Sequence, residues 1–172
     1  NIRTTNATGT YKIQTRLEVA REALIAVVEE MRGKINWGLA TFNNGNGATI
    51  NPLLDPDVAD DTNIAEVRNR LNAISADGGT PLGEALQDVF EDGYYAQRND
   101  LDSLLCRKNY VIAVSDGFPS ADSDWSRISG KTFSDEDGDG FTADPSQYSS
   151  PAANYYDDVA HWMYTHSWRD KS

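Results

Sequence analysis

One run of six residues, 110–115, reads Tyr-Val-Ile-Ala-Val-Ser and is apolar up to its last position. A strand with one solvated face alternates apolar and polar side chains, so an uninterrupted apolar run is typical of a strand that is covered on both faces. Parallel sheets between two layers of helices provide that environment. The run therefore predicts a buried strand and, with it, a layered α/β domain.

Helical and strand patterns alternate around this run. Apolar residues recur every three or four positions in four predicted helices, which cover residues 16–31, 64–74, 81–90 and 155–166. Two further strands are predicted over residues 35–42 and 48–53, joined by a turn rich in Asn and Gly. Residues 1–15 are polar and show no apolar period, so we expect an irregular arm there.

The sequence also predicts where two helices begin or end and which side chains the helices bury. Gly33 is expected to stop the first helix, and Thr80 to cap the third, with Pro81 in its first turn. The expected buried stripe of the first helix is Leu17, Ala20, Leu24, Val27, Val28 and Met31. That of the last helix is Val159, Trp162 and Met163.

Composition limits the possible partners. Lys and Arg number 15 against 27 Asp and Glu, and the net charge is −12. Such a chain repels phosphate backbones and anionic membranes, which argues against nucleic acid as a partner. No apolar run approaches about 18 residues, so we expect no membrane insertion. The chain opens at Asn1 without a methionine, as a mature or excised chain would.

Cys106 is the single cysteine of the chain. One thiol forms no internal disulfide, and a buried free cysteine is the ordinary interpretation. In an exported protein Cys106 would instead be able to pair with a cysteine outside this chain. The sequence leaves both alternatives open.

A second informative segment is residues 135–141, Asp-Glu-Asp-Gly-Asp-Gly-Phe. Carboxylates at alternate positions and a glycine at the sixth aim several oxygens from one tight loop at a common point. Carboxylates held that close repel one another unless a hard cation lies between them, and Ca²⁺ is the natural occupant. The expected ligands are the side chains of Asp135, Asp137 and Asp139 and the backbone carbonyl of Phe141.

The twelfth position of such a loop normally carries an acid, but Ser146 stands there. We expect Asp158 to supply the missing carboxylate, because the apolar stripe of the last helix follows it at +1, +4 and +5. Residues from about 132 to 158 would then be a calcium-loop insertion. Asp144 and Asp157 are rivals for this role, and a solvated acidic loop without an ion is the alternative to the whole site.

A second candidate site lies at predicted strand ends. Asp116 directly follows the apolar run, and ligands of open α/β sheets bind at the carboxyl ends of strands. The Thr80 hydroxyl, at a helix start, is expected near the same edge. The two oxygens suit Mg²⁺. Alternatively, Thr80 is only a helix cap and Asp116 only opens a turn.

Two segments carry a family resemblance. Residues 78–86, Gly-Gly-Thr-Pro-Leu-Gly-Glu-Ala-Leu, and residues 109–117, Asn-Tyr-Val-Ile-Ala-Val-Ser-Asp-Gly, resemble the second and third motifs of a von Willebrand factor type A domain. Together with residues 135–140 and 156–160, the chain is more narrowly similar to the N-terminal region of PilY-type proteins. These are type IV pilus tip-associated adhesins and pilus biogenesis factors. The resemblance covers residues 16–169.

The resemblance implies a Rossmann-like three-layer fold and a metal-ion-dependent adhesion site. In that family the threonine matching Thr80 binds the ion, and the aspartate matching Asp116 binds it directly or through water. The first motif of the site, Asp-x-Ser-x-Ser, has no counterpart here, and the first and last strands of the family are absent from the chain. We therefore expect one partial domain over residues 1–172, with an incomplete adhesion-type site.

These observations favour a non-enzymatic, calcium-binding domain that acts in pilus biogenesis or adhesion. The resemblance implies export through the periplasm, a place at the cell surface, and pilus subunits or a host or surface ligand as partners. A missing central strand also makes self-association plausible. Two alternatives remain: a metal-dependent hydrolase using Asp116 and the acidic loop, and a purely structural acidic module. Against the hydrolase, neither histidine, His161 or His166, lies near a catalytic motif.

Overall fold

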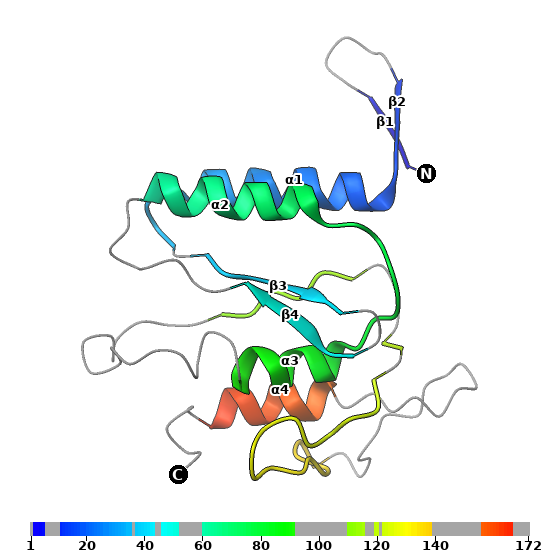
Figure 1. Cartoon of the computed structure of the whole chain (residues 1–172), viewed down its shortest axis with the longest axis vertical. Helices are drawn as coiled ribbons and strands as arrows, with labels where there is room; N and C mark the ends of the chain where they lie inside the picture. Colours follow the sequence, from blue (N-terminus) through cyan, green and yellow to red (C-terminus); the bar gives the residue numbers. More distant parts are fainter. Residues whose placement is uncertain are drawn as a thin grey trace. The chain divides into compact units, whose positions relative to one another are not determined.

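The computed structural model describes residues 2–5, 11–35, 37–43, 46–51, 60–91, 110–115, 119–120, 122–138 and 156–166. Within them it contains four helices and two small two-stranded sheets (Figure 1). The chain divides into two compact units. The first comprises Asn1–Leu39 and Leu53–Ala76, and the second Ala40–Pro52 and Asp77–Ser172. The interpretation as one domain stays a prediction.

The first unit opens with a pair of strands where the sequence predicted an irregular arm. Strands β1 (Ile2–Thr5) and β2 (Tyr11–Gln14) pair antiparallel, with Ile2 opposite Gln14 and Thr5 opposite Tyr11. Their β-branched and aromatic residues favour strands even without an apolar period. The expectation for residues 1–15 was therefore wrong, because it relied on periodicity alone.

Two helices form the core of the first unit, α1 (Arg16–Glu30) and α2 (Asp60–Ala73). The side chain of Thr15 accepts the Glu18 N–H at 3.1 Å, and Glu18 accepts the Thr15 N–H at 2.6 Å. This reciprocal capping box satisfies two N–H groups that a helix start leaves without partners. The buried contacts between the helices come from Val28, Ile64, Val67 and Leu71.

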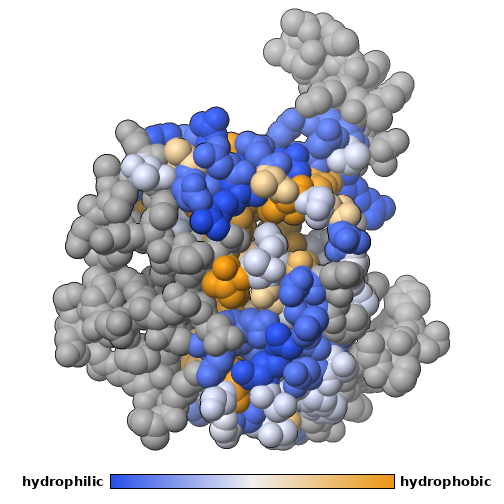
Figure 2. Space-filling view, viewed as in Figure 1, coloured by the Kyte–Doolittle hydropathy of each residue, from blue (hydrophilic) through white to orange (hydrophobic). Residues whose placement is uncertain are grey.

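One residue of the predicted stripe in α1 is placed differently. Val27 is 45% exposed, whereas its neighbour Val28 is buried. Consecutive residues lie about 100° apart around a helix, so Val28 faces α2 while Val27 does not. The described surface over α1 and α2 in Figure 2 is mostly hydrophilic, in keeping with one narrow apolar stripe per helix.

Strands β3 (Leu39–Phe42) and β4 (Ala48–Asn51) are neighbours in one sheet, and apart from Leu39 they belong to the second unit. Strand β3 is shorter than the sequence predicted, because residues 35, 37 and 38 lie outside it, and residues 52–53 of the second predicted strand lie outside the described residues. In the connection, Gly47 has a φ of +63°, and a Cβ there would lie 1.9 Å from Asp88 Oδ2. Only glycine fits this close approach between the turn and the next helix.

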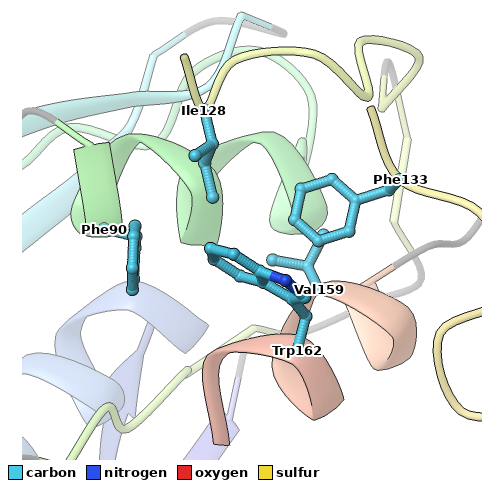
Figure 3. Close-up of a cluster of buried hydrophobic side chains, with 5 residues drawn as sticks. All are labelled: Phe90, Ile128, Phe133, Val159 and Trp162. Carbon is cyan, nitrogen blue, oxygen red and sulfur yellow. The ribbon is translucent and has the colours of Figure 1, made fainter. Parts of the chain in front are cut away.

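Helices α3 (Leu82–Glu91) and α4 (Tyr156–Thr165) pack together and enclose the main core of the second unit. Figure 3 shows the Trp162 ring between Phe90 and Phe133, beside Ile128 and Val159. The ring meets Phe90 and Phe133 edge-on, with centroids 4.9 and 5.6 Å away. Both predicted helices are thus confirmed, together with inward-facing Val159 and Trp162.

Residues 110–115 do not form the buried strand that the sequence predicted. The described structure assigns them to no strand, and Tyr110 is 79% exposed and Ile112 68% exposed. Burial on both faces requires neighbouring strands and two covering helix layers. Among the described residues the sheets have only two strands each, so nothing provides that cover. The mixed α/β class holds, without a central parallel sheet in the described part of the chain.

No described helix combines the length and the apolar character needed to cross a bilayer.

The core around Trp162 predicts a specific stability effect. Replacing Trp162 with alanine removes the ring that joins Phe90 to Phe133 and leaves a cavity, so we expect a loss of about 3–5 kcal/mol in the free energy of unfolding. Tyr164 on the same helix is 90% exposed, and its replacement by alanine should change stability by less than about 0.5 kcal/mol. Urea denaturation of both variants tests this difference. Equal losses would contradict the assignment of the core.

Candidate metal centre

Three carboxylates converge in the second unit. Oxygen atoms of Asp135, Asp137 and Asp158 all lie within 4.8 Å of one another. The first two side chains are exposed and lie in the loop after Phe133, whereas Asp158 is buried in the first turn of α4. Three acidic oxygens at this spacing are able to hold a metal ion.

Backbone hydrogen bonds shape the loop around this triad. Asp135 Oδ1 accepts the Gly138 N–H at 2.9 Å, which closes a tight turn. Gly138 has a φ of +81°, a conformation that a residue with a Cβ rarely adopts. Asp158 Oδ1 accepts the Glu136 N–H at 2.6 Å and the Asp137 N–H at 3.4 Å. Asp158 therefore joins the loop to the helix that begins 20 residues later.

The surroundings of Asp158 disfavour the ionised form of its carboxyl group. Burial raises the pKa of its carboxyl group, and the negative charges of Asp157 and Asp137 raise it further. The N–H groups of Glu136 and Asp137 oppose this shift without cancelling it. A cation between the carboxylates would remove the repulsion and replace the lost hydration.

Glu136 lies within the loop, but its side chain is not part of the triad. It forms an ion pair with Lys131, whose ammonium group also lies over the rings of Phe133 and Trp162. Burial opposes ionisation of Glu136, but the bonds from Lys131 and Ser134 outweigh it and lower the pKa of the carboxyl group. The pair anchors the loop to the core next to the triad.

The remaining predicted ligands have different outcomes. Asp139 and Phe141 of the acidic loop lie outside the described residues, as does Asp116 of the second candidate site. Thr80 is described and forms a backbone bridge with Ser120: the Thr80 N–H donates to the Ser120 carbonyl at 3.2 Å, and the Ser120 N–H donates back at 2.9 Å. The pairing of Thr80 with Asp116 around a metal thus stays a prediction.

The structure distinguishes among the acids that were candidates for the missing carboxylate of the loop. Asp158 belongs to the triad, as the sequence predicted. Its rival Asp157 is not part of this group, and its Oδ1 accepts the Asp158 N–H at 3.0 Å. The other rival, Asp144, lies outside the described residues, as does Cys106.

Sequence reasoning missed the residue that caps α3. Asp122 is fully buried, and its two oxygens accept the N–H groups of Gly83 and Glu84, both at 2.8 Å. In return, Glu84 Oε1 accepts the N–H groups of Ser123 and Asp124. Asp122 thus provides the side-chain cap expected from Thr80. Because cap and helix start lie 39 positions apart, no local pattern indicated the pair.

A partly buried arginine, Arg127, joins the same helix to its neighbours. Arg127 binds Asp88 with two parallel hydrogen bonds, Nε to Oδ1 at 2.6 Å and Nη2 to Oδ2 at 2.8 Å. Asp88 also accepts the Ala48 N–H at 2.8 Å, which connects α3 to β4. The hydrogen bond to Asp88 raises the pKa of Arg127, with further help from the charge of Glu84. All of these groups are engaged in holding segments together, which is a structural role.

Comparisons of the chain with protein-family models, with curated proteins and with solved structures find no match.

The cap of α3 predicts a clear loss of stability. Replacing Asp122 with alanine leaves two buried N–H groups without acceptors, so we expect the free energy of unfolding to fall by about 2 kcal/mol or more. The matched control is Asp77→Ala at an exposed position, expected to change it by less than about 0.5 kcal/mol. Urea denaturation followed by circular dichroism measures both. A neutral Asp122→Ala variant would contradict the assigned cap.

Asp122 should also make stability depend on pH. Burial raises the pKa of its carboxyl group, although the N–H groups of Glu84 and Gly83 oppose the shift. The folded state then binds the proton more tightly than the unfolded state, and stabilisation through this group is lost as the pH rises through the raised pKa. The stability of the wild type relative to Asp122→Asn should therefore increase as the pH falls from about 7 to about 4. Urea denaturation across this range tests the sign, and a relative stability that decreases on acidification would refute it.

Proposed function

We propose that the chain is a calcium-binding, non-enzymatic interaction domain. The observation that supports this most strongly is the convergence of Asp135 and Asp137 with Asp158, which comes from a distant helix. Two loop N–H groups donate to Asp158 and offset only part of the burial and repulsion that disfavour its charge. A common cation would offset the rest.

The chemistry of the triad favours calcium over other ions. All three ligands are carboxylates, and zinc prefers nitrogen and sulfur donors. Magnesium requires near-ideal octahedral geometry, whereas Ca²⁺ accepts six to eight oxygens in flexible arrangements. The side chain of Asp139 and the carbonyl of Phe141 would add oxygens to the three carboxylates. Water would complete the coordination.

Calcium at this position would hold the acidic loop against the first turn of α4. The ion would bind both the loop and Asp158, and the core residues Val159 and Trp162 directly follow Asp158. An ion that binds only the folded arrangement stabilises it by mass action. Exposed ligands favour a weak site, with a dissociation constant of about 10⁻⁴–10⁻³ M, which suits extracellular calcium levels.

The wider role rests on the resemblance of the sequence. We propose a partial von Willebrand factor type A-like domain with a Rossmann-like three-layer fold, part of a PilY-type pilus biogenesis or tip adhesin protein. It would be exported through the periplasm to the cell surface and bind pilus subunits or a host or surface ligand. Mg²⁺ would bind at Thr80 and Asp116 if residues outside this sequence complete that site.

Calorimetric titration with calcium tests the proposal. We expect about one ion per chain, and Asp137→Asn or Asp158→Asn should weaken binding at least about tenfold, because each removes a charged ligand. Asp157→Asn is the matched control on the same helical turn, since asparagine keeps the oxygen that accepts the Asp158 N–H. It should weaken binding less than about threefold, through loss of one nearby charge.

Two results would overturn the proposal. One is the absence of calcium binding at millimolar concentration, which would favour the purely structural acidic module. The other is a control variant that loses as much affinity as the triad variants, which would show diffuse attraction by an acidic surface.

A further inference from the structure

The turn that leads into the acidic loop is fixed to the core on both sides. Ile128 and Phe133 are buried in the cluster around Trp162. Between them, Gly130 has a φ of +77°, and the Lys131 N–H donates to the Ile128 carbonyl at 3.0 Å. The backbone of Lys131 is therefore held in a tight turn between two core residues.

The side chain of Lys131 reaches from this turn over the core to the loop. Its ammonium group lies 5.2 Å from the centroid of the Phe133 ring and 5.8 Å from that of the Trp162 ring, the two rings drawn in Figure 3. The same group pairs with Oε1 of Glu136, and the two side chains are only 25% and 16% exposed. Partial burial and attraction to the rings favour a more fixed geometry than that of a surface ion pair.

Glu136 is bound through its side chain and through its backbone. Its Oε1 also accepts the Ser134 N–H at 3.3 Å and the Ser134 hydroxyl at 3.2 Å. Its own N–H donates to Asp158 Oδ1 at 2.6 Å. Because Glu136 lies between Asp135 and Asp137, fixing its position limits where these two carboxylates of the triad can lie.

We propose that Lys131 is a positioning residue of the candidate calcium site, which acts through Glu136 to hold the acidic loop against Asp158. This role rests on the proposed function and reverses the effect expected from charge alone. A cation near the site repels Ca²⁺, so by Coulomb's law its removal should tighten binding. Positioning predicts weaker binding instead, because a loop that is not held in place must be ordered when the ion binds.

Calorimetric titration of Lys131→Met with calcium tests the sign. Methionine is unbranched and keeps apolar contact with the rings, but it lacks the ammonium group that binds Glu136. We expect calcium binding to weaken about tenfold, as is usual when a group that orients metal ligands is removed. Lys131→Arg keeps a cation for Glu136 and should recover most of the lost affinity. Lys34→Met removes one positive charge at an exposed position and should change the affinity less than about twofold.

Amide hydrogen exchange of the calcium-free protein tests whether Lys131 positions the loop itself. The Glu136 N–H, which donates to Asp158, should exchange about tenfold faster in Lys131→Met than in the wild type, because the loop opens more often. The Ala85 N–H in α3, which donates to the Pro81 carbonyl at 2.9 Å, should exchange at the rate of the wild type. Equal acceleration of both amides would show a merely structural role for Lys131 and contradict the proposal.

The titration separates this proposal from the proposed function. If the wild type binds calcium and Lys131→Met binds it equally or more tightly, the positioning role is wrong while the calcium site stands. If the wild type binds no calcium at millimolar concentration, the proposed function fails and the positioning role fails with it.

Discussion

Repulsion among three carboxylates is the constraint on which the interpretation of the second unit depends. Asp135, Asp137 and Asp158 hold their oxygens within 4.8 Å of one another, although the burial of Asp158 already disfavours its charge. Two N–H groups from the loop compensate only part of that cost. A divalent cation would turn the repulsion into attraction and make the contact between loop and helix favourable.

The same contact connects the candidate metal centre to the hydrophobic core. Asp158 precedes Val159, and one turn later Trp162 packs between Phe90 and Phe133 (Figure 3). Glu136, which lies between Asp135 and Asp137, is paired with Lys131, whose ammonium group lies over the Trp162 ring. Glu136 and Asp158 thus tie the acidic loop to side chains that hold α3 and α4 together.

Features set by local sequence were predictable, and features set by distant partners were not. The helical period predicted α1 to α4, and the apolar stripe after Asp158 pointed to this residue as the distant carboxylate of the triad. The buried cap Asp122 escaped notice because its partners Gly83 and Glu84 are far away in the chain. The run 110–115 has the composition of a buried strand, but burial depends on neighbouring strands and helices that the described residues do not provide.

Anomalous diffraction from crystals grown in millimolar calcium tests the central claim most directly. The account predicts one calcium peak among the oxygens of Asp135, Asp137 and Asp158, at about 2.3–2.6 Å from its ligands. A well-ordered map with water or no peak between these oxygens would contradict it.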